Sequence, residues 1–304
     1  MSLLIIGTVA FDAIETPFGK TDKIVGGSAT YVGLSATKLG QKPNLVAVVG
    51  DDFPQESIRM MNSKGFNLDG LQIKKGEKTF FWSGKYHNDM NSRDTLVTEL
   101  NVLESFEPTI PDSYQGCEYL MLGNLAPVVQ QQVINGLTKR PKLIVMDTMN
   151  FWMDIMMDDL KKTIAMVDVI TINDEEARQL SGEYSLLSAA RKIQAMGPRF
   201  VIIKKGEHGA LLFHEDNMFY CPGLPIEMVK DPTGAGDTFA GGFIGFLSKT
   251  DDISFENMKR AIVAGSALAS YCVEEFGTKR MEDITERDLD NRIEEFIDLM
   301  KVSF

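Results

Sequence analysis

Short apolar runs alternate along the chain with longer segments in which apolar residues recur every three to four positions. The runs are bounded by polar residues or glycine, as is typical of strands buried on both faces of a sheet. We expect strands at 3–6, 45–49, 119–122, 143–146, 167–172 and 200–203. The amphipathic segments predict helices at 28–39, 54–64, 127–139, 174–181, 185–196, 235–248, 254–275 and 285–301. This alternation favours an α/β fold with a mostly parallel central sheet and helices on both faces.

The segment 71–100 breaks this alternation. It is polar and aromatic, with a rough two-residue period that includes Phe80, Trp82 and Tyr86. Such a pattern is typical of half-exposed antiparallel strands. We therefore expect a small β-sheet that stands off the main one and acts as a mobile lid, formed from about 12–25 and 71–100. No linker-like stretch divides the chain, so a single domain over 1–304 is expected.

Composition narrows the classes of function. The chain has 304 residues, of which 44% are hydrophobic, and a net charge of −12. A strongly acidic chain repels nucleic acids and anionic membranes, so neither is expected as a partner. The three cysteines lack the spacing of a zinc site or a disulfide framework. Without a signal-like segment or an apolar run of membrane-spanning length, a cytoplasmic location is expected.

The segment 231–242 is the most informative candidate site. Gly234, Ala235 and Gly236 lead directly into Asp237 and a segment with helical periodicity. The start of a helix presents free backbone N–H groups and a positive dipole end, which together bind phosphate. An anion cradle beside a carboxylate base is what phosphoryl transfer onto a hydroxyl requires. Taken alone, however, an acid in the first turn of a helix is usually a cap or a dipole-compensating charge.

The longer string D-P-T-G-A-G-D-T-F-A-G-G-F, beginning at Asp231, resembles the second signature of the ribokinase-like (PfkB-type) family of carbohydrate and nucleoside kinases. The resemblance implies a three-layer ribokinase-like fold with a small β-sheet lid. It also implies that Asp237 is the catalytic base and that the backbone of residues 234–236 forms the anion hole for the transferred phosphate.

A second string, Gly26-Gly27 followed by a run of small residues, resembles the first signature of the family. There the resemblance implies that Gly26, Gly27 and Asp12 bind the acceptor. The sequence departs from ribokinase at Ser28 and Tyr31, which stand where ribokinase has Lys and Asn, and this puts ribose in question. Tyr31 either stacks on or closes over the acceptor, or it simply packs in the interior.

Two further strings complete the resemblance. Asn173 and Glu176 match the N-x-x-E motif that positions hydrated magnesium and phosphates. Lys204, Gly206 and Gly209 match the nucleotide loop, in which the lysine reaches ATP phosphate and the glycines let the chain pass the nucleotide. Read alone, the first string is typical of a helix N-terminus and the second of a turn between strands.

Many family members bind potassium beside the anion hole. The resemblance implies that Asp231 is a potassium ligand here and that Thr233 lies in the loop at the nucleotide and the ion. The other half of such a site would fall in 272–281. Glu275 and Met281 stand there where ribokinase has Arg and Ser.

The resemblance implies an ATP-dependent phosphotransferase that uses Mg²⁺, and in many members K⁺, to phosphorylate a primary hydroxyl of a sugar. A nucleoside kinase is the alternative within the same class. A sugar- or nucleotide-binding sensor on an inactive kinase scaffold is the alternative from another class, and it has no need of Asp237. The lid aromatics also suggest a homodimer formed through the lid.

Overall fold

The computed structural model describes residues 1–302, which form a nine-stranded sheet and a five-stranded sheet. The large sheet has the order β14-β13-β12-β11-β10-β9-β1-β5-β6. All of its neighbouring strands are parallel except at the β12–β13 and β13–β14 pairs. The strands are β1 (Leu3–Ile6), β5 (Asn44–Gly50), β6 (Asn67–Lys74), β9 (Tyr119–Leu122), β10 (Leu143–Asp147), β11 (Val169–Asn173), β12 (Phe200–Lys204), β13 (Ala210–His214) and β14 (Asn217–Cys221). The predicted mostly parallel sheet is confirmed.

Successive side chains of the parallel strands enter opposite cores, because the strand period is two. In β1, Leu3 and Ile5 belong to one hydrophobic cluster, whereas Leu4 and Ile6 belong to the other. All four are at most 1% exposed. The uninterrupted apolar runs of the sequence therefore reflect a sheet that is covered on both faces.

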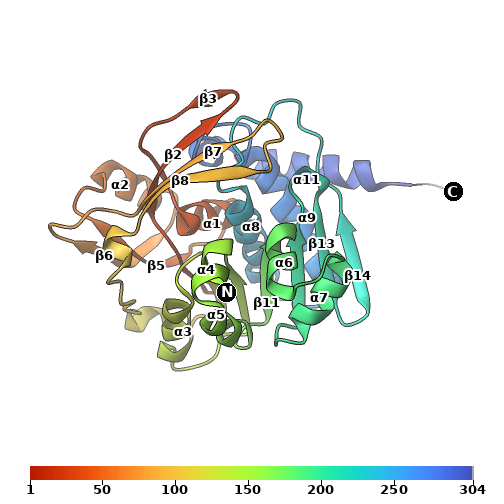
Figure 1. Ribbon diagram of the computed structural model, residues 1–304, viewed down its shortest axis with the longest axis horizontal. Coiled ribbons are helices and arrows are strands. Elements are labelled where there is room, and N and C mark those ends of the chain that lie inside the picture. The colour runs from red at the N-terminus through yellow and green to blue at the C-terminus, as the bar shows by residue number, and fades with distance from the viewer. Residues whose placement is uncertain (303–304) are drawn as a thin grey trace.

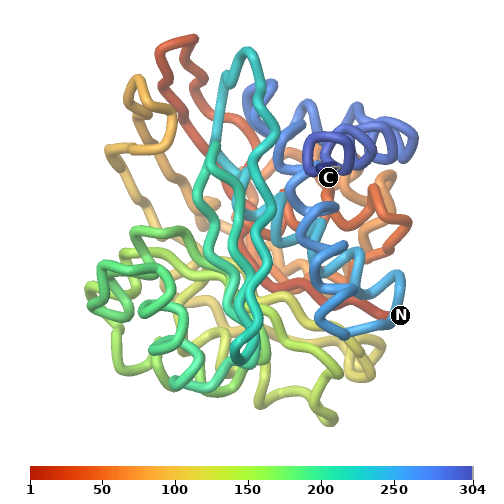
Figure 2. Tube along the Cα trace, turned by 90° about the vertical axis from the view of Figure 1, so that its right-hand side faces the viewer, coloured from red at the N-terminus to blue at the C-terminus, as the bar shows by residue number. Residues whose placement is uncertain are grey.

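Two layers of helices provide that cover, on opposite sides of the large sheet (Figure 2). The first layer contains α1 (Ser28–Thr37), α2 (Gln55–Ser63), α8 (Ala235–Thr250), α9 (Phe255–Cys272), α10 (Lys279–Asp283) and α11 (Glu286–Met300). The second contains α3 (Pro127–Gly136), α4 (Asn150–Ile155), α5 (Met157–Ile164), α6 (Asp174–Ser181) and α7 (Leu186–Gln194). The eight predicted helices are present, whereas the short helices α4, α5 and α10 were not predicted. Within residues 1–302, no helix is both long and apolar enough to cross a membrane.

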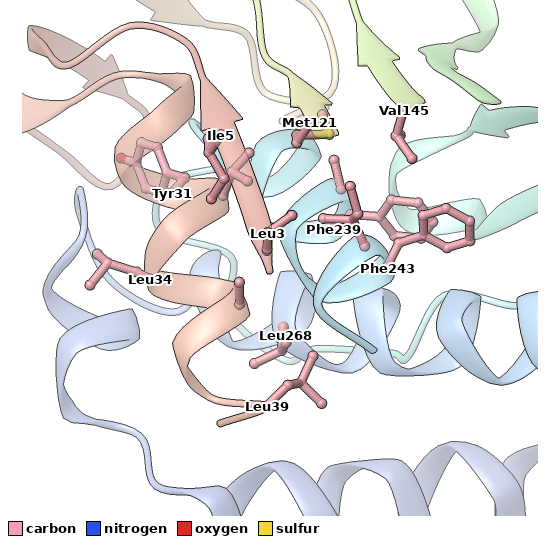
Figure 3. Packing of buried hydrophobic residues seen from close by; sticks show 14 of the residues in the cluster. Leu3, Ile5, Tyr31, Leu34, Leu39, Met121, Val145, Phe239, Phe243 and Leu268 are labelled. Atoms are coloured by element: carbon pink, nitrogen blue, oxygen red, sulfur yellow. The ribbon is translucent and has the colours of Figure 1, made fainter. Parts of the chain in front are cut away.

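Helix α8 lies between α1 and α9 and packs against both with its backbone. A Cβ built on Gly241 would overlap the carbonyl oxygen of Val32 in α1, and one on Gly242 would lie 2.8 Å from the Cα of Gly265 in α9. Figure 3 shows the phenyl rings of Phe239 and Phe243 directed from α8 into the core beneath the sheet. The glycines of α8 thus bring the helices that follow both candidate signatures into direct contact.

The small sheet stands beside the large one, over α1 and α8 in the view of Figure 1. Its strands are β2 (Ala10–Thr16), β3 (Gly19–Lys20), β4 (Ile24–Gly26), β7 (Phe81–Tyr86) and β8 (Arg93–Glu99). The order is β3-β2-β7-β8, with β4 also paired to β2. The predicted separate small sheet is confirmed, although β2 and β7 run parallel rather than antiparallel.

One predicted boundary of the small sheet is wrong. Residues 71–74 belong to β6, which pairs with β5 as the edge strand of the large sheet. Because β6 is an edge strand, most of its residues are half-buried, and Asp69 and Ile73 are exposed. Its pattern therefore resembles that of the small sheet, whose second part begins at Phe81.

Candidate active site

The start of α8 forms an uncapped anion-binding loop. Gly234 is the N-cap residue, with a φ of 76° in the left-handed region, and no side chain caps the helix. A Cβ on Gly234 would also lie 2.5 Å from three carbons of the Tyr31 ring, so both the backbone conformation and the available space require glycine. No side chain therefore competes with an anion for the first N–H groups of this 16-residue helix, although the backbone N–H of Ala235 donates to the Pro232 carbonyl over 3.2 Å.

Asp237 lies in the first turn of α8 and remains partly accessible. Burial and the nearby Asp147 raise the pKa of its carboxyl to about 7, although Lys204 and Arg93 act in the opposite direction. A carboxyl group that titrates near neutrality is well suited to accept a proton from a hydroxyl. Asp237 therefore has both the place and the acidity of a general base.

Lys204 lies at the end of β12, beside the anion loop. Its Nζ is 2.6 Å from Asp147 Oδ2, which also accepts a hydrogen bond of 3.0 Å from the Thr171 hydroxyl. A Cβ on Gly236 would lie 3.0 Å from the same Nζ. Burial disfavours the charged amine, but Asp147 and Glu176 raise its pKa overall. Lys204 is therefore a fixed positive charge at the loop.

Asn173 and Glu176 form a reciprocal capping box at the start of α6. The backbone N–H of Asn173 donates to Glu176 Oε2 over 2.7 Å, and the backbone N–H of Glu176 donates to Asn173 Oδ1 over 2.8 Å. Glu176 is buried, which raises the pKa of its carboxyl to about 7, and Asp147 adds to the shift against Lys204. The cap accounts for the local conformation of both residues. It also places the Glu176 carboxylate in the same acidic cluster as Asp147.

Asp12 and the glycine pair form the other side of the site. Asp12 in β2 is only 5% exposed, and a Cβ on Gly26 would overlap its Oδ2 atom. The Gly27 amide hydrogen-bonds to the carboxylate. Burial, Asp231 and Asp237 raise the pKa of Asp12 to about 7 against that bond. The two candidate signatures, more than 200 residues apart, therefore present their acids to a common region.

The surroundings of Tyr31 favour packing in the interior over stacking of its ring on the acceptor. Its side chain is 1% exposed, and its hydroxyl is buried without a hydrogen-bond partner within residues 1–302. Burial, Cys272 and the carboxylates of Asp12, Asp231 and Asp237 hold the pKa of this hydroxyl well above its usual value. Tyr31 thus lies beneath the anion loop.

Asp231 ties the anion loop to the turn that follows α9. The backbone N–H groups of Thr233 and Gly277 each donate to its carboxylate over 2.9 Å. Its side chain is fully buried, which raises the pKa of the carboxyl. Glu275 is ion-paired with Lys230 over 2.6 Å, and Met281 is buried in the core. Within residues 1–302, the hydrogen bonds to the Asp231 carboxylate come from backbone groups and from neither of these side chains.

The glycines of the predicted nucleotide loop have different surroundings. A Cβ on Gly206 would overlap Oδ1 of Asn91, in the hairpin between β7 and β8. A Cβ on Gly209 would instead overlap the carbonyl oxygen of Cys221 at the end of β14. Gly206 is thus where the small sheet meets the loop, whereas Gly209 is needed for packing within the large sheet.

Sequence reasoning missed four residues that the fold brings to the site: Asp147, Thr171, Tyr86 and Arg93. Asp147 ends a buried parallel strand, which is the signal that singled out Asn173, since ligands bind at the carboxyl ends of such strands. Of the two residues of the small sheet, Tyr86 was predicted only as a lid aromatic, and Arg93 gave no local signal. The structure reveals them because the Thr233 hydroxyl donates to the Tyr86 hydroxyl over 3.2 Å.

An uncapped helix N-terminus, a lysine beside it, an acid in its first turn and a buried acid opposite are the groups that phosphoryl transfer onto a hydroxyl requires. The sequence pattern of the pfkB family carbohydrate kinases matches residues 2–285. The chain belongs to this family, whose members phosphorylate hydroxyl groups of sugars and nucleosides. The predicted fold, family and enzyme class are thereby confirmed.

Individual relatives agree with this assignment. The chain is 32% identical over 255 residues to the cytidine kinase of Thermococcus kodakarensis, covering 82% of this chain and 89% of that kinase. The structure of a nucleoside kinase from Burkholderia thailandensis in complex with inosine superposes with a TM-score of 0.78, at 20% identity and over 97% and 96% of the two chains. The aminoimidazole riboside kinase from Salmonella enterica, solved with aminoimidazole riboside and an ATP analog, gives a TM-score of 0.76 at 18% identity over 96% and 100%. The bound ATP analog of this last structure agrees with ATP as the phosphoryl donor of the family.

Proposed function

We propose that this chain transfers the γ-phosphoryl group of ATP to the primary hydroxyl of a nucleoside, with sugars as the second acceptor class to test. The single observation that carries the reaction type is the placement of Asp237 at the uncapped start of α8, beside Lys204. The acceptor class is supported by the 32% identity to a cytidine kinase. The alternative of an inactive sensor is disfavoured because Asp237 and its loop are intact.

In the proposed step, Asp237 takes the proton of the acceptor hydroxyl. The oxygen of this hydroxyl forms a bond to the γ-phosphorus at the same time. The bond from that phosphorus to the β–γ bridging oxygen breaks, and ADP leaves with the electron pair. The backbone N–H groups of residues 234–236 hold the developing negative charge. Lys204 neutralises phosphate charge, and Asp12 with Gly26 and Gly27 orients the acceptor.

Glu176 and Asp147 would hold Mg²⁺ only together with ATP phosphate oxygens, because residues 1–302 contain no group of three or more His, Cys, Asp or Glu side chains that could hold a metal ion. Glu176 and Asp147 offer oxygen atoms, which this ion prefers, and both lie near Lys204 and Asp237. Asn173 would position Glu176, which in turn would hold the ion through water. When bound with ATP, Mg²⁺ would neutralise phosphate charge.

At the proposed K⁺ site, Asp231 would supply a buried negative charge and Thr233 the adjoining backbone. Gly206 and Gly209 shape the path of the nucleotide loop.

We further propose that the small sheet acts as a lid over the acceptor. We also propose that two copies of the chain form a homodimer through this sheet. Strand β8 is exposed along its whole length at the free edge of the small sheet, and Leu96 is 55% exposed. An exposed edge strand is a surface that another chain can pair with. Sedimentation tests the dimer. A location in the cytoplasm and the lack of nucleic-acid partners stay predictions.

A panel of nucleosides and sugars, assayed by coupled ADP release, tests the proposed function. Turnover with a nucleoside but not with sugars supports the nucleoside proposal. Turnover with a sugar alone would reassign the acceptor and keep the reaction type. If ATP binds but no acceptor on the panel yields ADP above the rate of Asp237→Asn, the chain is a sensor rather than a kinase.

A further inference from the structure

The side-chain amide of Gln130 joins the ends of two strands at the point where their ladder stops. The last paired residues of β9 and β10 are Leu122 and Met146. Just beyond this pair, the Gln130 Nε2 donates to the carbonyl oxygen of Gly123 over 3.0 Å and to that of Asp147 over 3.2 Å. Gln130 lies in α3, and its side chain is fully buried. One amide therefore fixes the spacing of two strands at their carboxyl ends, the edge of the sheet that carries the site.

The end of β10 belongs to the phosphate side of the site. The Asp147 carboxylate accepts a hydrogen bond of 2.7 Å from the backbone N–H of Thr148 and is paired with Lys204, which lies beside the anion loop. Burial and the charge of Asp147 raise the pKa of the Asp237 carboxyl. Against the effect of burial, Asp147 also raises the pKa of the Lys204 amine. A shift of the Asp147 backbone would therefore alter both the proposed base and the fixed positive charge.

The end of β9 supports the acceptor side. A Cβ on Gly123 would lie only 2.8 Å from Ser28 Oγ, so β9 ends directly against the start of α1. Ser28 follows Gly27, whose backbone amide hydrogen-bonds to the Asp12 carboxylate. In the order of the large sheet, β9 lies between β10 and β1. The two carbonyl groups that Gln130 holds thus belong to opposite halves of the site.

One atom of this amide has no partner. The Oε1 of Gln130 is buried and accepts no hydrogen bond within residues 1–302. Buried polar atoms without a partner are rare in proteins and cost stability. Other buried side chains of α3, such as those of Val129 and Val133, are apolar. An apolar side chain at residue 130 would avoid the cost, so the two carbonyl groups explain the amide better than packing does.

We propose that Gln130 is a positioning residue that sets the separation between the phosphate side and the acceptor side of the active site. Because it is fully buried, it contacts neither reactant and acts through Asp147 and Gly123. Transfer requires the reacting atoms to be aligned closely, and a misplacement of about 1 Å can cost 10²-fold in rate. The assignment rests on the proposed function and adds to it a residue outside all four sequence strings.

Gln131 provides a matched control. Its Nε2 also donates to two oxygen atoms, the Asp159 carbonyl over 2.9 Å and Thr163 Oγ1 over 3.0 Å, but these lie in α5, which supplies none of the site residues. Gln130→Met and Gln131→Met each remove one bridging amide and keep the length of the side chain. Gln130→Asn keeps the amide on a shorter stem that cannot reach both carbonyl groups.

Circular dichroism and Tm show which variants fold. Gln130→Asn carries the test if Gln130→Met does not fold, and failure of both to fold would make Gln130 a structural residue and overturn the assignment. We expect Gln130→Met to lower kcat by about 10- to 100-fold, the usual effect of losing a partner that orients a functional group. Gln131→Met should stay near wild type in kcat, although both changes lower Tm.

The pH profile gives a reading that a purely structural role does not move. In the wild type, the midpoint of kcat/KM on the acid side should reflect Asp237, whose pKa burial and Asp147 raise to about 7, against Lys204 and Arg93. In Gln130→Met this midpoint should move to lower pH, because a displaced Asp147 raises the pKa of Asp237 less. Gln131→Met should keep the midpoint of the wild type.

Titration calorimetry with ATP and Mg²⁺ needs no acceptor. Because Asp147 and Lys204 are proposed to face the phosphates, Gln130→Met should bind ATP about 10-fold more weakly than Gln131→Met. The assignment is overturned if the two variants agree in kcat, pH midpoint and ATP affinity, or if Gln130→Met changes kcat alone, since distorted packing explains that pattern. Wild-type protein that binds ATP but transfers to no acceptor instead contradicts the proposed function, and the ATP affinities still decide the role of Gln130.

Discussion

The ring of Tyr31 lies against Gly234, so close that a Cβ at residue 234 would come within 2.5 Å of three ring carbons. Tyr31, one of the residues that depart from the ribokinase pattern, thus forms the floor of the proposed anion hole. Gly234→Ala would both strain the left-handed backbone and displace the ring. Because correct placement of one anion-hole donor is worth about 10²- to 10³-fold in kcat, we expect a loss of at least that size. Steady-state assays measure kcat of the variant. A Tm close to that of the wild type would show that the loss of kcat is confined to the site.

Tyr31→Phe is the gentler change at the same contact. It keeps the ring under Gly234 and removes a buried hydroxyl that lacks a partner. Removing an unsatisfied buried group is expected to leave stability unchanged or raise it by about 1 kcal/mol. Thermal unfolding measures this directly. A Tm several degrees below wild type would mean that the hydroxyl has a bonded partner in solution.

Asp237→Asn keeps the shape of the site but cannot take a proton. Loss of a general base costs about 10²- to 10⁴-fold in kcat, whereas ATP affinity should change little. Because the pKa of Asp237 is about 7 in the free protein, kcat/KM of the wild type should fall as the pH drops below neutrality. Stopped-time ADP assays across pH 5.5–8.5 record both effects. Near-normal turnover in the variant would remove Asp237 from its proposed role.

The buried acids predict an unusual dependence of stability on pH. The pKa values of Asp12 and Glu176 are raised to about 7 in the folded state, against about 4 in unfolded chains. The folded protein then binds more protons than the unfolded chain between these values. The free energy of unfolding therefore decreases as the pH rises from about 4 to about 7. Without nucleotide, we expect a higher Tm at pH 5.5 than at pH 8.

Asp12→Asn tests how much of this pH dependence of the free energy of unfolding comes from Asp12. At pH 8 the variant avoids a buried charge and should have a Tm a few degrees above wild type, whereas at pH 5 the difference should vanish. The same variant should bind acceptor more weakly, by about 1.5–3 kcal/mol for a lost charged hydrogen bond, and leave ATP binding unchanged. An equal Tm gap at both pH values, or equal loss of both ligands, would indicate a purely structural Asp12.

Potassium activation is expected to be modest. Asp231 already receives two backbone hydrogen bonds, whereas Glu275 is paired with Lys230 and Met281 is buried in the core. An ion there would act by ordering the 231–236 loop and would raise kcat more than it changes acceptor affinity. Assays in potassium, sodium and a bulky organic cation at fixed ionic strength measure this. Identical rates in all three would show that Asp231 shapes the loop through Thr233 and Gly277 alone.

Periodicity predicted the parallel sheet and eight helices because strands buried on both faces and amphipathic helices leave strong local patterns. It missed the antiparallel hairpin of β13, which is largely buried, and β14, which is largely exposed. It also assigned 71–74 to the wrong sheet, because the half-buried residues of an edge strand resemble those of the small sheet. At the site, the four strings identified the residues near their own turns. Asp147 was within reach of the same reasoning, whereas Tyr86 and Arg93 become relevant only through cross-strand pairing, which one sequence does not reveal.

The glycines within α8 have a consequence for alignment of the reactants. Gly241 lets α8 touch the backbone of α1, and these two helices begin at the anion loop and at Gly27 respectively. If the two loops hold phosphate and acceptor as proposed, the separation between the attacking hydroxyl and the phosphorus is set by a contact between two helix backbones inside the core. A single methyl group there would push the loops apart, and a misplacement of about 1 Å can cost 10²-fold in rate. Reaction distance in this chain is a property of its packing as much as of its active-site side chains.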